Sequence, residues 1–216
     1  MKKLSTKSIA VYAIMTALIM VATYAIKIPT PATNGYANLG DAFVMFAGVV
    51  FGPIVGFLVG GAGSALADLA GGYAHWILPT FVIKGAEGAI SGILFLLLKR
   101  TKLNKFISVG ISTFVAGVIM ILGYFLASTI MKGSVAAAFA SFPANCVQGS
   151  VGVVIIMLIL VATYKIKGFD KLLGHNNFYY PKVEPKTVET VPENSDVATE
   201  TDDKNKDMDN NQGGEE

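Results

Sequence analysis

The chain has 216 residues, of which 53% are hydrophobic and only 15% charged, and its mean hydropathy is +0.56. A soluble domain carries about 25% charged residues, so this composition excludes an ordinary soluble fold. The net charge of +2 averages two different regions, because all but three of the 15 acidic residues lie after residue 164.

Apolar runs that approach the length of a bilayer span recur along the chain. A transmembrane helix needs roughly 20 apolar residues, and residues 9–26, 77–98, 106–131 and 147–164 form such runs. The first run is as long as a true span and more spans follow it, so we interpret it as a helix and not as a cleavable signal peptide. The stretch 42–70 is too long for one untilted span and short for two.

Basic residues resolve that stretch, because they stay on the cytoplasmic side of a membrane protein. They form three clusters, Lys2, Lys3 and Lys7, then Lys99, Arg100, Lys102 and Lys105, and finally Lys165, Lys167 and Lys171. If all three are cytoplasmic, the number of crossings between successive clusters is even, and residues 42–70 form two spans. We expect the turn between them at Gly56, Gly60, Gly61 and Gly63. The alternative is one steeply tilted helix.

The predicted fold is therefore an all-α, polytopic membrane protein with six transmembrane helices and both termini in the cytoplasm. Residues 1–173 form the transmembrane domain, and residues 174–216 form a charged cytoplasmic tail with too few apolar residues to fold. The two middle spans are short and interrupted by glycines, which is typical of a binding site inside a membrane protein.

Three ionisable residues interrupt the spans, namely Asp68, Lys84 and Glu87. Such residues are costly within a membrane and by default mark function. Lys84 and Glu87 are three residues apart, so their side chains can meet on one helix face. The pattern predicts either a substrate site or a structural ion pair between helices.

Further candidates lie in the loops that face outside. Asn38 and Asp41 end a polar loop, residues 30–41, that is long enough to act as a lid. Tyr73, His75 and Trp76 either sit at the lipid headgroups or offer flat faces to an aromatic ligand. No second histidine or cysteine lies near His75, so we predict no metal site.

Asn145 and Gln148 follow Pro143, where we expect the last helix to begin. Side-chain amides both donate and accept hydrogen bonds. The pair is predicted either to bind a ligand or to cap the start of the helix.

Small residues form two stripes. Ala10, Ala13 and Ala17 share one face of the first helix, and they serve either packing within the bundle or the docking of a partner helix. Gly52, Gly56, Gly60 and Ser64 are spaced by four residues, and Asp68 continues the row; tight internal packing or a turn explains it.

Signatures of enzymes are missing from the sequence. It contains no G-x-x-x-x-G-K-[ST] phosphate loop, no H-E-x-x-H and no G-x-S-x-G motif. We therefore predict that the chain is not an enzyme and that it carries no cofactor.

The sequence resembles the substrate-binding S components of energy-coupling factor (ECF) transporters, in the branch that includes riboflavin, hydroxymethylpyrimidine and pyridoxine carriers. The resemblance rests on Asn38-Leu39-Gly40-Asp41, Phe51-Gly52-Pro53, Ala67-Asp68-Leu69, Gly71-Gly72-Tyr73 and Lys84-Gly85-Ala86-Glu87-Gly88. It covers roughly residues 8–165, and the acidic tail is not part of the pattern.

The resemblance implies a multi-pass protein of the bacterial plasma membrane with a vitamin site near the outer face. It also implies a partner complex of one membrane coupling subunit, the T component, and two ATPase subunits. In the family an Ala-x-x-x-Ala motif of the first helix docks on the coupling subunit, and Ala13 to Ala17 match it.

The charge of these residues narrows the choice of ligand. Asp68 and Glu87 against Lys84 leave about one negative charge, which disfavours a phosphorylated vitamin and suits a flat, neutral or weakly basic heteroaromatic ring. We favour hydroxymethylpyrimidine or pyridoxine. The alternatives are a riboflavin-specific S component, a stand-alone proton-coupled secondary carrier, and a structural membrane protein without a ligand.

Overall fold

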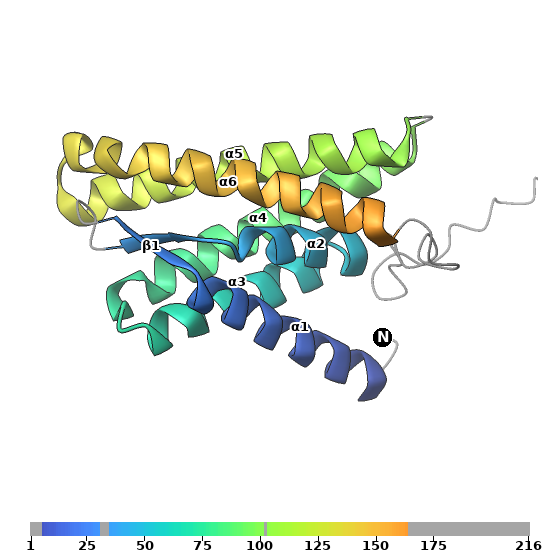
Figure 1. The fold of residues 1–216 in the computed structure, drawn as a ribbon, viewed down its shortest axis with the longest axis horizontal. Helices are drawn as coiled ribbons and strands as arrows, with labels where there is room; N and C mark the ends of the chain where they lie inside the picture. The colour runs from blue at the N-terminus through green and yellow to red at the C-terminus, as the bar shows by residue number, and fades with distance from the viewer. Residues whose placement is uncertain (1–5, 31–34, 102, 164–216) are drawn as a thin grey trace, which may run out of the picture. The chain divides into compact units, whose positions relative to one another are not determined.

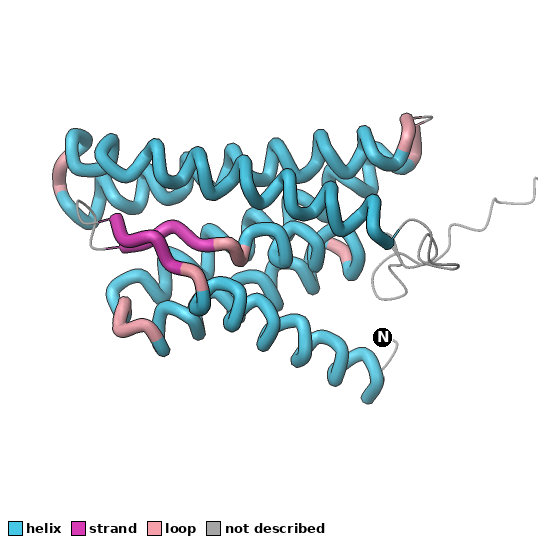
Figure 2. The backbone as a smooth tube through the Cα atoms, viewed as in Figure 1, coloured by secondary structure: helices cyan, strands magenta, loops and turns pink. Residues whose placement is uncertain are grey.

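The computed structural model describes residues 6–30, 35–101 and 103–163, and the predicted tail lies outside them. Helices dominate the described chain (Figures 1 and 2). They are α1 (Thr6–Ala25), α2 (Asp41–Phe51), α3 (Pro53–Ala70), α4 (Ile77–Lys99), α5 (Lys105–Lys132) and α6 (Val135–Thr163), with a 3₁₀ turn, η2 (Ala74–Trp76), before α4. The predicted all-α class is confirmed.

A β-hairpin follows α1, where the sequence predicted a polar loop. Strands β1 (Lys27–Thr30) and β2 (Gly35–Asn38) pair antiparallel, with Lys27 opposite Asn38. The tip, residues 31–34, lies outside the described residues, and the lid remains a prediction.

Five of the six helices are long and apolar enough to cross a membrane, and the short α2 is not. Its 11 residues rise only about 16 Å. In Figure 1, α2 starts part of the way along the bundle, where β2 ends. The predicted number of helices is thus right, but the second one is too short to span a bilayer alone.

The break between α2 and α3 lies at Gly52, and the prediction of a turn at Gly56–Gly63 is wrong. Gly52 has φ of 90°, a conformation that only glycine adopts easily, and Pro53 begins α3, where its missing N–H is harmless. The glycines beyond it lie inside α3.

Those glycines allow close helix packing, as one reading of the stripe predicted. A Cβ on Gly56 would lie 2.7 Å from Gly48 Cα and 2.7 Å from the carbonyl oxygen of Gly88. A Cβ on Gly60 would lie 2.8 Å from the side chain of Val44. Side chains this small let α2, α3 and α4 approach one another closely.

The last helix begins earlier than predicted, at Val135, and Pro143 lies inside it. The expected break is wrong because a proline removes one backbone hydrogen bond, and membrane helices tolerate this when neighbouring groups compensate. Asn145 therefore does not cap a helix start.

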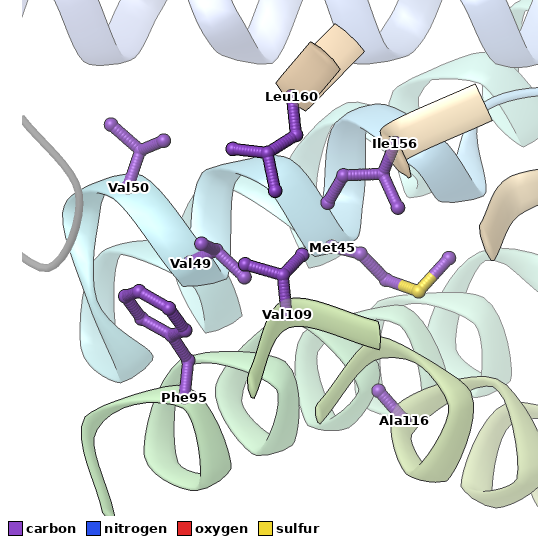
Figure 3. Packing of buried hydrophobic residues seen from close by; sticks show 8 residues of the cluster. All are labelled: Met45, Val49, Val50, Phe95, Val109, Ala116, Ile156 and Leu160. Carbon is purple, nitrogen blue, oxygen red and sulfur yellow. The ribbon is translucent and has the colours of Figure 1, made fainter. Parts of the chain in front are cut away.

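The bundle has two different ends. The start of α1, the α4–α5 connection and the end of α6 lie together, and the hairpin and η2 lie at the opposite end (Figure 1). We call the two parts the terminal half and the hairpin half. The core of the terminal half is apolar and draws on α2, α4, α5 and α6 (Figure 3); it comprises Met45, Val49, Val50, Phe95, Val109, Ala116, Ile156 and Leu160.

Candidate functional site

Lys84 of α4 is the centre of a buried ionic group. Its side chain is 1% exposed and forms ion pairs with Asp41 and with Glu87, whose Oε2 lies 3.0 Å from Lys84 Nζ. The predicted contact between Lys84 and Glu87 is confirmed. Asp41 was predicted at the end of a loop, but it is the first residue of α2, and there it becomes the second partner of Lys84.

Gln148 of α6 joins this ionic group to the hairpin. Its Nε2 donates to both carboxylate oxygens of Asp41, at 2.9 and 3.0 Å. Its Oε1 accepts a hydrogen bond from the backbone N–H of Asn38 at 2.8 Å, and the Asn38 side chain accepts one from Gly40 N–H. We call Asn38, Asp41, Lys84, Glu87 and Gln148 the polar cluster. Every member is buried.

An aromatic wall adjoins the polar cluster. The ring of Trp76 meets the ring of Tyr124 edge to face, with centroids 5.7 Å apart. The hydroxyl of Tyr124 donates to Thr80 Oγ1 at 3.2 Å, and Lys84 Nζ lies 5.6 Å from the centre of the Tyr124 ring. Cation–π contacts at this distance are attractive.

Tyr124 and Thr80 were not among the predicted site residues. The available signal was a tyrosine inside the apolar run 106–131, because a buried tyrosine hydroxyl needs a hydrogen-bond partner. The position of that partner on another helix could not be read from the sequence.

The other predicted residues are distributed unevenly around this site. Asp68 is buried on α3. Asn145 is buried one turn before Gln148, whereas His75 is exposed. Tyr73 is half-buried beside the ammonium group of Lys27, 5.4 Å from its ring centre. The structure therefore brings Trp76 into the site and leaves His75 outside it.

The ionic group has the net negative charge that was predicted, but Asp41 and not Asp68 is its second carboxylate. Asp41 and Glu87 face the single ammonium group of Lys84, so full ionisation leaves an excess of one negative charge. Among the described residues, Glu87 Oε1 has no hydrogen-bond partner. The site thus offers a buried acceptor and disfavours anions.

Two hollows lie beside these helices. A cavity of about 210 Å³ reaches Asn38 and Gln148 from the side of α6, with otherwise apolar walls. A groove of about 470 Å³ lies between α4 and α5, and only apolar residues line it, among them Val82, Gly123 and Ala127. The first adjoins the polar cluster, and the second is suited to apolar chains.

The small-residue face of α1 is open. Ala10, Ala13 and Ala17 are exposed, while Ile19 and Thr23 face the bundle. The face is therefore accessible to another helix, and packing inside the chain's own bundle does not explain it.

Comparisons with known proteins give a family match and several relatives. The family described as "ECF-type riboflavin transporter, S component" matches residues 3–165. The thiamine precursor transporter HmpT of Lactococcus lactis subsp. cremoris is 29% identical over 170 residues, 76% of this chain and 94% of that protein. An uncharacterized protein of Pyrococcus woesei is 39% identical over 137 residues, 63% of this chain and 88% of its own length.

A solved structure shares the fold. The S component of a bacterial ECF transporter superposes with a TM-score of 0.55 at 18% identity, over 73% of this chain and 95% of the solved chain. Because the family match covers most of the chain, including every residue of the polar cluster, this multi-pass membrane protein belongs to the family of ECF-type riboflavin transporter S components.

Proposed function

We propose that the chain captures a small heteroaromatic vitamin or vitamin precursor for uptake, with hydroxymethylpyrimidine or pyridoxine as the favoured ligand. The observation that carries this proposal is the polar cluster, which is buried among membrane helices beside an aromatic wall. Burying ion pairs often costs more than their attraction returns, so such groups inside a membrane by default mark function.

The chemistry of the site supports that class of ligand. Tyr124 and Trp76 offer ring faces, Glu87 Oε1 offers an acceptor, and the surplus of carboxylates disfavours a phosphorylated compound. A flat, neutral or weakly basic ring with amino or hydroxyl groups meets all three conditions. The ion pairs of the polar cluster also link helices within the bundle. This structural role is compatible with ligand binding, because the ion pairs hold Glu87 in place.

Riboflavin is the second candidate, and the name of the matching family favours it. The relative named as a thiamine precursor transporter favours the smaller pyrimidine. The ribityl chain of riboflavin carries several hydroxyl groups, each of which needs a partner once buried. The described residues of the site offer few polar atoms without a hydrogen-bond partner, so we retain the preference for a small ring. The membership of the family gives no support to a stand-alone proton-coupled carrier.

The remaining parts of the proposal concern the partners. As an S component, the chain docks on a membrane coupling subunit, the T component, that two ATPase subunits drive. We place the contact on Ala10, Ala13 and Ala17, because the face is exposed and small. The basic clusters of the sequence support a cytoplasmic location for both termini.

Titration of the purified full-length protein with hydroxymethylpyrimidine, pyridoxine and riboflavin tests the choice of ligand. A ligand that binds only the native state raises its thermal stability. We expect a response to one of the small rings. A response to riboflavin alone would assign the chain to the second candidate, and no response to any of them would contradict the proposed class of ligand.

Docking has a separate test. Ala13→Trp places a bulky side chain on the exposed face of α1, so it should abolish uptake in cells while the isolated protein still binds ligand. Ala140→Trp, at an exposed position of α6, is the matched control and should leave uptake intact. Equal loss of ligand binding in Ala13→Trp would show that the face packs internally.

A further inference from the structure

The contact between α3 and α4 changes character along its length. Gly56 lies against Gly88, and a Cβ on Gly60 would lie 3.2 Å from the carbonyl oxygen of Lys84. Each contact is four residues further along α3 and four residues back along α4, as expected for antiparallel helices. The next step of the same register puts Ser64 opposite Thr80. Beyond the start of α4, the end of α3, which carries Asp68, is in contact with η2, which carries Trp76.

These four residues form what we call the polar seam: Ser64, Asp68, Thr80 and Trp76. All four are buried. Tyr124 closes the seam from α5, because it contacts both Thr80 and Trp76. The two helices therefore touch through glycines near Gly56 and carry polar side chains between them toward the hairpin.

Two buried hydroxyls of the described residues, those of Thr23 on α1 and Ser64 on α3, have no hydrogen-bond partner, and only Ser64 lies in the polar seam. Serines and threonines in membrane helices normally donate to a carbonyl three or four residues earlier. Ser112 does so to Val109 and Ser141 to Ala138. In contrast, Ser64 Oγ has no hydrogen-bond partner in the described part of the chain, although its side chain is only 1% exposed.

A second polar group in the seam also lacks a hydrogen-bond partner among the described residues. The indole N–H of Trp76 is buried and has no hydrogen-bond partner among residues 6–30, 35–101 and 103–163. An unsatisfied buried polar group costs free energy, and two of them on facing helices indicate a shared partner. The seam lies beside Tyr124, whose ring also adjoins Lys84, so that partner would lie at the edge of the proposed vitamin site.

We infer that Ser64 and Trp76 are specificity-determining residues that hydrogen-bond the bound ligand from α3 and η2. This inference rests on the proposed function. The indole N–H only donates, the hydroxyl donates or accepts, and Glu87 Oε1 accepts when ionised. The complementary ligand is a flat ring with an acceptor, such as a ring nitrogen or a hydroxyl oxygen, on one edge and a donor, such as an amino group, on another.

Calorimetric titration of the full chain with hydroxymethylpyrimidine, pyridoxine and riboflavin tests the inference on four proteins: wild type, Ser64→Ala, Trp76→Phe and Ser112→Ala. Loss of one hydrogen bond should weaken binding about tenfold in Ser64→Ala and in Trp76→Phe. Ser112→Ala removes an equally buried hydroxyl that already bonds a carbonyl, so its affinity should stay at the wild-type value.

Analogues that lack one polar group separate ligand contact from a structural role. For one analogue, wild type should lose about tenfold in affinity, while Ser64→Ala should bind it as it binds the parent compound. A purely structural serine would lower all affinities by the same factor. If Ser64→Ala does not fold, Ser64→Gly replaces it, because glycine extends the row of Gly56 and Gly60.

The outcomes are distinguishable. Tight binding by wild type with unchanged binding by Ser64→Ala and Trp76→Phe, or a uniform loss across all analogues, would overturn the inference and leave the proposed function standing. If wild type binds none of the three compounds, the proposed function is overturned and the inference falls with it.

Discussion

The terminal half and the hairpin half of the bundle use the same helices for different purposes. Along α2 the buried residues change from Asp41 at its start to Met45 and Val49. Along α6 they change from Gln148 to Ile156 and Leu160. The terminal half is held by close packing of apolar side chains and glycines, which is the usual means of association in lipid. The hairpin half buries charges and amides, and it holds the unpaired hydroxyl of Ser64, whereas Ser112 in the terminal half donates to a backbone carbonyl. A membrane protein gains little stability from that second arrangement, and this contrast supports the proposal that the ligand binds in the hairpin half.

Replacing the central cation should break the hairpin half most severely. Lys84→Met leaves the carboxylates of Asp41 and Glu87 buried without their ammonium partner. We expect a loss of about 3–5 kcal/mol in the free energy of unfolding, together with loss of ligand binding. Unfolding in mild detergent measures the first effect and titration the second.

A triple variant, Lys84→Met with Asp41→Asn and Glu87→Gln, sharpens this test. Because it removes all three charges together, it should regain most of the stability and still fail to bind ligand. Restored binding in the triple variant would show that the charges serve only to hold the helices together.

Adding one methyl group at the glycine contact should disturb the packing on which both halves depend. In Gly88→Ala the new Cβ would lie 2.7 Å from the carbonyl carbon of Gly56, so we expect a loss of about 1–3 kcal/mol in unfolding free energy. Gly110→Ala is the matched control, because its Cβ meets only Met157 Sδ at 4.0 Å. Equal stability of the two variants would contradict the close α3–α4 contact.

Gln148 connects the hairpin to the ionic group, so its removal should affect both. Gln148→Met keeps the length of the side chain but loses the hydrogen bonds with Asn38 and Asp41. The expected cost is about 1–2 kcal/mol in unfolding free energy, with faster hydrogen exchange of the Asn38 amide. Ser150→Met, at an exposed position of the same helix, should change neither quantity. Wild-type exchange at Asn38 in the Gln148 variant would refute the connection.

The smallest effect is expected in the terminal half. Ile156→Val removes one buried methylene from the apolar core and should cost about 0.5–1.5 kcal/mol of stability. Ligand affinity should not change, because Ile156 supplies no polar group to the site. A drop in affinity as large as that of Ser64→Ala would erase the distinction between the halves.

Much of this architecture was predictable from the sequence, because apolar length and basic clusters are direct consequences of the bilayer. The contact between Lys84 and Glu87 was also predictable, since three-residue spacing on a helix is a local property. The turn at Gly52 was not predictable, because glycine occurs both in turns and in close helix packing. The sequence of α3 contains several glycines, and each of them was an equally good candidate for the turn.

Long-range partners were the other gap. Asp41 was a candidate by its charge, but its contacts with Lys84 and Gln148 depend on how α2, α4 and α6 meet. Pro143 suggested a helix start that the surrounding helix overrides. Tyr124 and Ser64 carried weak signals, since a single tyrosine or serine in an apolar run acquires meaning only from the helix that faces it.

The most direct measurement is a structure of the protein with the tightest-binding of the three compounds. We expect the ligand in the hairpin half, with its ring against Tyr124 and its polar atoms about 3 Å from Glu87, Ser64 or Trp76. A ligand seated instead in the apolar groove between α4 and α5, with the polar cluster untouched, would contradict the claim that the buried polar half is the binding site.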